Sequence, residues 1–225
     1  MKISQSADAI IVAAGSGLRF GAAKQFATLD GMPLYQHSLK TFACHPLIGR
    51  IVLVVAADDI TRIESETQPV FFGKKIEIAL GGATRQDSFA NGMQKFEELG
   101  SSEIILVHDA ARPFVSTELI TNVIGGILKY GSALAAIPVV DTLKNSNDGF
   151  SIGSIPRTNL WRAQTPQGGR FELLKQALET ARTNSHLATD EAELLECIGI
   201  KPLLVMGDDW NVKITYEKDL PKNFS

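Results

Sequence analysis

The stretch that decides the fold lies near the N-terminus and reads Val12-Ala13-Ala14-Gly15-Ser16-Gly17-Leu18-Arg19-Phe20-Gly21-Ala22-Ala23-Lys24-Gln25. It follows an apolar run at 9–12 that is typical of a buried strand, and three glycines within seven residues allow a sharp turn. Such a turn can direct several backbone N–H groups at one anion. Because Arg19 and Lys24 add positive charge, the pattern predicts a loop that holds the phosphates of a nucleotide. An ordinary strand-to-helix turn is the alternative.

Two familiar phosphate-binding motifs do not fit this loop. A P-loop requires a lysine directly after its second glycine, and no glycine of the stretch is followed by lysine. The dinucleotide fingerprint G-x-G-x-x-G fails because three residues separate Gly17 from Gly21, and the acidic pair Asp58-Asp59 follows too late. An NAD-dependent dehydrogenase is therefore kept only as an alternative of a different class, which NADH binding would test.

Strand-like apolar runs alternate with helical patterns along the rest of the chain. Strands are expected at 9–12, 51–55, 76–80, 104–107, 133–140, 203–206 and 212–214. Helices are expected at 33–42, 58–66, 85–100, 171–182 and 190–197, and after an N-cap at Ser116. This order implies an α/β fold, in which a parallel sheet carries helices on both faces.

The pattern changes at about 138–159, where the chain becomes polar. The run Asn145-Ser146-Asn147-Asp148-Gly149 is typical of a hairpin turn, so we expect a β-arm that leaves the main sheet. An isolated two-stranded arm has little apolar surface to bury on its own chain. We therefore predict a single domain over 1–225 that forms a homodimer through this arm.

Composition limits the function classes. Of 225 residues, 44% are hydrophobic and 21% charged, which is typical of a globular protein, and the net charge of −3 argues against nucleic-acid binding. With no signal peptide or membrane-spanning run, we expect a cytoplasmic protein with small-molecule partners. Cys44 and Cys197 lie far apart and the four histidines form no H-x-x-x-H pair, so we expect buried free thiols and no zinc site.

Four motifs that follow predicted strands are candidates for a binding site, because the carboxyl ends of parallel strands meet at one edge of the sheet. They occupy residues 15–24, 81–88, 109–112 and 141–142. The glycine pair Gly81-Gly82 allows a base or ribose to approach the backbone, and Ser88 is placed to read a base edge; a plain tight turn is the alternative.

The motif His108-Asp109-Ala110-Ala111-Arg112 carries the remaining charges. Asp109 suits a magnesium ion or a ribose and Arg112 suits a phosphate, whereas a helix cap or a structural Asp–Arg pair is the alternative. No nucleophile accompanies His108, so we interpret it as a packed strand-end residue and not as a catalytic base.

Taken together, the motifs resemble one family. The loop at 13–19 with Lys24-Gln25 resembles nucleotidyltransferases of the sugar-nucleotide pyrophosphorylase type. The following runs are similar to the 2-C-methyl-D-erythritol 4-phosphate cytidylyltransferase family: Gly81-Gly82-Ala83-Thr84-Arg85-Gln86-Asp87-Ser88, His108-Asp109-Ala110-Ala111-Arg112-Pro113-Phe114, Asp141-Thr142-Leu143-Lys144, Arg157 with Leu160-Trp161, Ala163-Gln164-Thr165-Pro166-Gln167, Thr189-Asp190-Glu191-Ala192 and Asn211-Val212-Lys213-Ile214-Thr215. The resemblance covers nearly the whole chain.

The resemblance implies a Rossmann-like three-layer sandwich with a mostly parallel central sheet and a protruding β-arm. It implies an enzyme that joins CTP and methylerythritol phosphate and releases pyrophosphate, in the non-mevalonate route to isoprenoids. Magnesium, or another divalent cation, would be held mainly by the triphosphate, with Asp109 as the one protein ligand.

The resemblance also implies roles for individual residues. Arg19 and Lys24 would stabilise charge on the reacting phosphates, and Arg157 and Lys213 would hold the acceptor's phosphate, with the arginine supplied by the neighbouring subunit. The nucleotide would be held by Ala13, Ala14, Gly15, Gly17, Gly82 and Ser88. The acceptor or metal region would be lined by Asp109, Arg112, Thr142, Thr165 and Thr189. For Thr189, an N-cap is the alternative.

Two further alternatives remain open from the sequence. A ribitol 5-phosphate cytidylyltransferase is the nearest one, although its loop typically reads Asp-Ala-Val-Arg where this chain has Asp109-Ala110-Ala111-Arg112. A non-catalytic nucleotide-binding protein is the other, and it would be expected to lack Arg19 or Lys24, which are both present.

Overall fold

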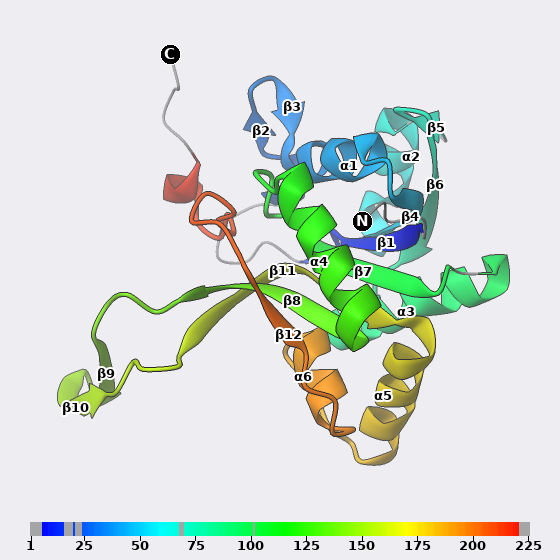
Figure 1. Ribbon diagram of the computed structural model, residues 1–225. Helices are drawn as coiled ribbons and strands as arrows, with labels where there is room; N and C mark the ends of the chain where they lie inside the picture. The colour runs from blue at the N-terminus through cyan, green and yellow to red at the C-terminus, as the bar shows by residue number, and fades with distance from the viewer. Residues whose placement is uncertain (1–5, 16–19, 21–23, 68–69, 101, 221–225) are drawn as a thin grey trace.

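The computed structural model contains a central eight-stranded sheet (Figure 1) and describes residues 6–15, 20, 24–67, 70–100 and 102–220. In spatial order the strands are β12 (Leu203–Met206), β8 (Ser132–Pro138), β11 (Trp161–Arg170), β7 (Ile104–Asp109), β1 (Ala7–Val12), β4 (Ile48–Val55), β6 (Lys74–Leu80) and β5 (Val70–Phe71). The neighbours of β1 run parallel to it, with Ile10 opposite Val52 and Val107. Only β11 and β5 pair antiparallel with their neighbours in this sheet, so the expected mostly parallel α/β sheet is confirmed.

Helices cover both faces of the sheet, as predicted (Figure 1). One face carries α1 (Leu34–Cys44), α2 (Ile60–Glu66) and α4 (Thr117–Tyr130), and the other carries α3 (Arg85–Leu99), α5 (Phe171–Thr183) and α6 (Glu191–Glu196). Successive strand residues point to opposite faces, so Ile10 and Ile11 belong to different apolar clusters although neither is exposed. The central strands β1, β4 and β7 are therefore buried on both sides.

Local signals explain where the helices begin. The Ser116 hydroxyl accepts a hydrogen bond from Leu119 N at 3.1 Å, which confirms the predicted N-cap of α4. Pro33 was expected inside the first turn of α1, but it is the residue before the helix and lies in β3 (Met32–Pro33), which pairs with β2 (Thr28–Leu29). The N-cap of α6 is Asp190, so the alternative interpretation of Thr189 as the cap is wrong.

Two strand expectations differ from the structure. Residues 212–214 form no strand. The backbone N–H of Ile214 donates to the carbonyl of Ala111, but no ladder of hydrogen bonds follows, and the Ile214 side chain packs into a small cluster with Leu29 and Leu34. The predicted strand at 133–140 ends at Pro138. The antiparallel strand β11 was not predicted, and its glycines and Pro166 give it little strand character in the sequence.

The expected arm leaves the main sheet between β8 and β11. It is a separate two-stranded sheet of β9 (Leu143–Asn147) and β10 (Phe150–Ile155), which extends away from the body in Figure 1. The hairpin turn falls at Asp148 and Gly149, which both have positive φ, as the sequence suggested. Phe150 is 77% exposed and Ile152 67%, so their apolar surface is not buried within this chain.

Both cysteines are free, but the expectation that they are buried is wrong, because each is exposed. Cys44 follows Phe42 by two residues on α1, which turns its side chain away from the buried stripe that includes Leu39 and Phe42. Among the described residues, no helix is both long and apolar enough to cross a membrane.

Candidate active site

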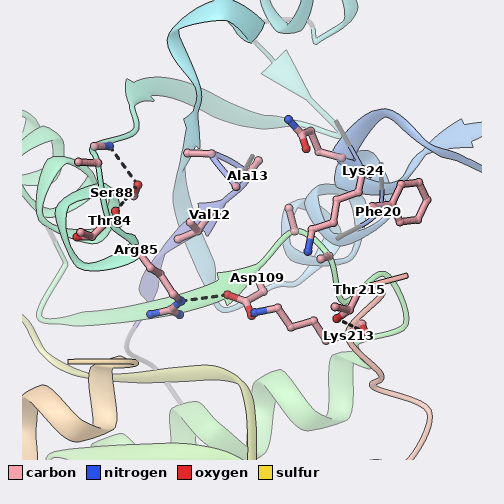
Figure 2. Close-up of a pocket in the computed structure, with 17 residues that line it drawn as sticks. Val12, Ala13, Phe20, Lys24, Thr84, Arg85, Ser88, Asp109, Lys213 and Thr215 are labelled. Atoms are coloured by element: carbon pink, nitrogen blue, oxygen red, sulfur yellow. Dashed lines mark hydrogen bonds and ion pairs between the residues drawn. The ribbon is translucent and has the colours of Figure 1, made fainter. Parts of the chain in front are cut away.

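A pocket of about 600 Å³ lies at the carboxyl edge of the sheet (Figure 2). Its walls come from three strand ends, which are the segment after β1, the loop between β6 and α3, and the end of β7. Lys24 and Gln25 from the 3-10 turn η1 (Lys24–Phe26) and Lys213 and Thr215 from the C-terminal region complete it. Three of the four predicted motifs therefore converge, as expected for parallel strands.

Eight of the predicted site residues that the structure describes line this pocket. They are Ala13, Ala14, Gly15, Lys24, Gly82, Ser88, Asp109 and Lys213. Gly17 and Arg19 lie outside the described residues, so their roles remain predictions.

Five other predicted residues do not line the pocket. Thr142 is exposed beyond β8, and Arg157 lies on the arm, where its guanidinium donates to the carbonyl of Val140. Thr189 is exposed and its hydroxyl donates to Glu193 at 2.8 Å. The remaining two, Arg112 and Thr165, support the pocket from behind Asp109.

Asp109 is the electrostatic centre of the site. Its Oδ2 lies 2.6 Å from Lys213 Nζ and 3.9 Å from Arg112 Nε, and its Oδ1 lies 3.3 Å from Arg85 Nε. Figure 2 shows Arg85 and Lys213 approaching it from opposite sides. Burial alone would raise the pKa of the Asp109 carboxyl, but the three cations outweigh burial and hold this pKa well below its ordinary value. The side chain is therefore a carboxylate at neutral pH, and the Asp–Arg pairing weighed from the sequence is present.

His108 lies behind Asp109 and is completely buried. Its Nε2 lies 3.1 Å from the carbonyl of Arg112 and its Nδ1 lies 3.0 Å from the Thr165 hydroxyl, whose oxygen accepts from Asp109 N at 3.0 Å. This network assigns the proton to Nε2 of a neutral ring. Burial lowers the pKa of His108 to about 4. His108 is thus a packed strand-end residue that holds the backbone at Asp109, as the sequence interpretation had it.

The glycine pair is required by close packing around the loop between β6 and α3. A Cβ on Gly81 would overlap the side chain of Ala14, and a Cβ on Gly82 would overlap that of Asp87. Gly81 therefore lets this loop pack against the segment after β1, and Gly82 lets it pack against the start of α3. Ser88 is buried, and its hydroxyl donates to Thr84 O at 3.0 Å and accepts from Gly82 N at 3.1 Å, so it shapes this loop.

Sequence reasoning missed two charged residues of the site. Arg85 lines the pocket, and both of its terminal nitrogens bind the buried carboxylate of Glu191 at 2.6 and 3.0 Å. Both residues lie inside motifs that carry the family resemblance, but no sequence pattern indicates that two residues 106 positions apart form a buried pair. Phe20, Gln25, Thr84 and Thr215 also line the pocket without having been predicted to.

The cations Lys24, Arg85 and Lys213 line the pocket together with Gly15 and Gly82, at the carboxyl edge of a mostly parallel sheet. Such a site can neutralise the charge of a nucleoside triphosphate and donate backbone N–H groups to it. Fold and site thus define a nucleotidyltransferase of the α/β class. Comparison with known proteins narrows the class further. Residues 7–223 match the family model described as 2-C-methyl-D-erythritol 4-phosphate cytidylyltransferase, and the chain belongs to this family.

Individual relatives agree with this membership. The 2-C-methyl-D-erythritol 4-phosphate cytidylyltransferase of Dechloromonas aromatica is 42% identical over 225 residues, covering 94% of this chain and 93% of that protein. A bifunctional enzyme IspD/IspF of Desulfotalea psychrophila is 42% identical over 213 residues, which are 94% of this chain but 54% of that protein. The chain therefore spans about half of the bifunctional relative and nearly all of the other.

Solved structures of relatives have the same fold over nearly the whole chain. The crystal structure of the Francisella tularensis 2-C-methyl-D-erythritol 4-phosphate cytidylyltransferase has a TM-score of 0.82 at 29% identity, covering 96% of this chain and 97% of that one. The Thermus thermophilus enzyme has a TM-score of 0.78 at 32% identity, with 96% of both chains covered. The predicted Rossmann-like three-layer architecture is therefore confirmed, and the dehydrogenase and non-catalytic alternatives are set aside.

Proposed function

We propose how the pocket carries out its family's reaction, the transfer of CMP from CTP to 2-C-methyl-D-erythritol 4-phosphate with release of pyrophosphate. The triphosphate of CTP lies beside Lys24 and the loop that contains Gly15, and the nucleoside lies toward Gly82 and Ser88. The acceptor's phosphate lies near Lys213. The family resemblance assigns Gly17 and Arg19 to the triphosphate as well.

One observation carries this arrangement. Lys24 Nζ donates to the carbonyl of Ile214 at 3.3 Å, although 190 positions separate the two residues. This contact brings Lys24 against the segment that carries Lys213, so two lysines from opposite ends of the chain line one pocket. The reaction requires two anions to meet, and a site with separate cations for each anion is suited to that task.

The chemistry needs no covalent enzyme intermediate. An oxygen of the acceptor's phosphate attacks the α-phosphorus of CTP in line, the bond between that phosphorus and the β-bridging oxygen breaks, and pyrophosphate leaves with the electron pair. Negative charge on the phosphoryl oxygens is then stabilised by Lys24 and Arg19, so positioning and electrostatics supply most of the catalysis. Asp109 forms the wall on the acceptor side and holds Lys213 in place at 2.6 Å, while Arg112 and Thr165 support Asp109 from behind.

A pyrophosphate-release assay tests this proposal. With CTP, the protein is expected to turn over methylerythritol phosphate and not ribitol 5-phosphate. Lys24→Ala is expected to lower kcat on the order of 100-fold or more, because one preorganised charge is lost from the transition state. Lys201→Ala, an exposed lysine away from the pocket, is the matched control. Turnover of Lys24→Ala within a few-fold of wild type would contradict the assigned role.

We further propose that the active enzyme is a homodimer, with a single domain per chain, and that the arm brings Arg157 to the acceptor of the neighbouring subunit. Arg157 does not line its own chain's pocket, and the arm carries exposed apolar side chains. Thr142, at the base of the arm, and Thr189 would reach the acceptor region in the same assembly.

Mixing two inactive variants tests the shared site. In a dimer of one Lys24→Ala chain and one Arg157→Ala chain, one site has both substitutions and the other has neither if Arg157 acts across the interface. Recovered activity on mixing is the expected result. No recovery in mixed dimers of verified composition would place Arg157 in its own chain's site or outside the chemistry.

We also propose that Mg²⁺ or another divalent cation accompanies CTP, and that the enzyme works in the cytoplasm. Among the described residues, no group of three or more His, Cys, Asp or Glu side chains is placed to hold a metal. Asp109 is the one carboxylate among the pocket residues described, and three cations already contact it. These residues fit a metal held mainly by triphosphate oxygens and water. Loss of activity with a chelator, restored by Mg²⁺, is the expected result.

A further inference from the structure

Glu191 is a carboxylate buried next to the pocket without lining it. It is the first residue of α6, and its side chain is 1% exposed. Oε1 accepts from Arg85 Nη1 at 2.6 Å and Oε2 accepts from Arg85 Nη2 at 3.0 Å. A buried carboxylate bound by both arms of a guanidinium is the strongest geometry that such a pair adopts. Glu191 therefore fixes the plane of the Arg85 guanidinium.

The orientation of Arg85 has a consequence for Asp109. With both terminal nitrogens turned to Glu191, only Nε of Arg85 faces Asp109, and it reaches Oδ1 at 3.3 Å. Oδ2 is left to bind Lys213 Nζ at 2.6 Å. Charges alternate along this row as Glu191, Arg85, Asp109, Lys213, so each cation and each anion in it has an opposite neighbour.

We propose that Glu191 is a positioning residue of the acceptor side of the site. By occupying the two arms of Arg85, it prevents Arg85 from binding both oxygens of Asp109, and so it leaves one oxygen to hold the Lys213 ammonium where the acceptor's phosphate arrives. This inference rests on the proposed role of Lys213 in binding that phosphate.

Arg85 without Glu191 would behave differently. Its guanidinium has five donors in a fixed fork that matches a carboxylate, and Asp109 is the neighbouring one. A fork-to-fork pair between Arg85 and Asp109 would engage Oδ2 and displace Lys213. The expected defect is therefore weaker binding of the acceptor, with CTP binding on the Lys24 side little changed.

Steady-state kinetics of Glu191→Gln tests the inference. The substitution keeps the shape of the side chain and removes its charge. We expect KM for methylerythritol phosphate to rise on the order of 10-fold, the effect of losing one charge-assisted hydrogen bond, while KM for CTP stays within about 2-fold. Glu196→Gln, on the exposed side of α6, is the matched control and should leave both constants unchanged. A purely structural role of Glu191 would lower the yield of folded protein without separating the two KM values.

A double-mutant cycle with Lys213→Ala decides whether Glu191 acts through Lys213. Adding Glu191→Gln to Lys213→Ala should raise KM for the acceptor no further. If the two effects add in full, or if Glu191→Gln changes both KM values equally, the positioning role is wrong. If Lys213→Ala alone leaves KM for the acceptor unchanged, the proposed role of Lys213 is wrong, and the positioning role of Glu191 is then wrong as well.

Glu191→Asp provides a second route should Glu191→Gln fail to fold. It keeps the negative charge but shortens the side chain by one CH₂ group, so the carboxylate no longer reaches both terminal nitrogens of Arg85, which now bind at 2.6 and 3.0 Å. It should produce the same selective rise in KM for the acceptor, and an unchanged KM would overturn the inference.

Discussion

At the scale of single residues, the titratable groups that only support the site, His108 and Glu191, are almost completely buried and do not line the pocket. His108 is the clearest case, because it stands beside Asp109 in the sequence yet has no exposed surface. Its ring is neutral because Nδ1 accepts from Thr165 while Nε2 donates to the Arg112 carbonyl. A protonated ring would have to give up the first of these bonds.

The buried neutral ring predicts how stability depends on pH. The pKa of His108 is about 4 in the folded protein, whereas an unfolded histidine titrates near 6.5. Between these values the unfolded state binds more protons, so the free energy of unfolding falls as the pH falls. From pH 7.5 to 5.0 we expect this histidine to account for a loss of about 2 kcal/mol. Urea denaturation at both pH values measures the loss.

His108→Gln provides the comparison for that measurement. Glutamine can still donate to the Arg112 carbonyl but does not titrate, so the variant should lose less stability over the same interval. All other groups titrate in both proteins. An equal loss in the variant and the wild type would show that His108 is not the origin of the effect.

The residue scale is also where sequence reasoning was most uneven. Lys24 could be placed from local pattern, because a cation near a glycine-rich loop after a strand has a physical reason to be there. Lys213 could be placed only through the family resemblance, since on local pattern it would be an exposed lysine. The pair of Arg85 and Glu191 could not be found, because burial of a charge depends on the tertiary arrangement of α3 and α6.

At the scale of elements, the sequence indicated the start of α4 correctly. A hydroxyl that caps a free backbone N–H needs only local geometry, so Ser116 could be recognised as the N-cap without knowledge of the tertiary structure. Ser116→Ala removes the acceptor for Leu119 N and is expected to cost about 1 kcal/mol of stability. Because Ser116 does not line the pocket, kcat and both KM values should stay unchanged.

Urea denaturation with parallel kinetics checks the Ser116 prediction. Ser116→Asp serves as the control, since a carboxylate can replace the hydroxyl as a cap and should retain the stability. A change in KM in the alanine variant would mean that the start of α4 also influences the pocket.

The strand β11 shows why other elements escaped prediction. A Cβ on Gly168 would overlap the carbonyl oxygen of Ile105, so this strand needs glycine where isolated strands favour branched residues. Its strand conformation is imposed by β7 and β8 on either side. Residues 212–214 show the opposite case, in which a strand was predicted and none is present. Their alternating apolar pattern results from the burial of Ile214 alone, which packs against Leu29 and Leu34.

At the scale of the whole molecule, the arm divides the chain into a compact body and a projecting hairpin (Figure 1). We predict that Phe150→Ser combined with Ile152→Ser shifts the protein toward monomers. Each side chain that is buried at an interface contributes about 1.5–3 kcal/mol, so the dimer dissociation constant should rise on the order of 100-fold or more. Sedimentation velocity across a dilution series measures this change.

The same variant also provides a control for the dimer proposal. Phe150 and Ile152 are exposed in the chain, so their replacement should leave the melting of the body unchanged. Activity should fall together with the dimer fraction if Arg157 acts across the interface. A wild-type protein that sediments as a monomer at micromolar concentration while fully active would contradict the proposal.

The outward position of both thiols has a practical consequence. Cys44 ends a helix on one face of the sheet and Cys197 follows a helix on the other, and neither lines the pocket. The natural chain thus offers two maleimide attachment points on opposite outer layers, without any engineered cysteine. Fluorophores attached there would report by energy transfer whether the two layers move relative to each other when substrates bind.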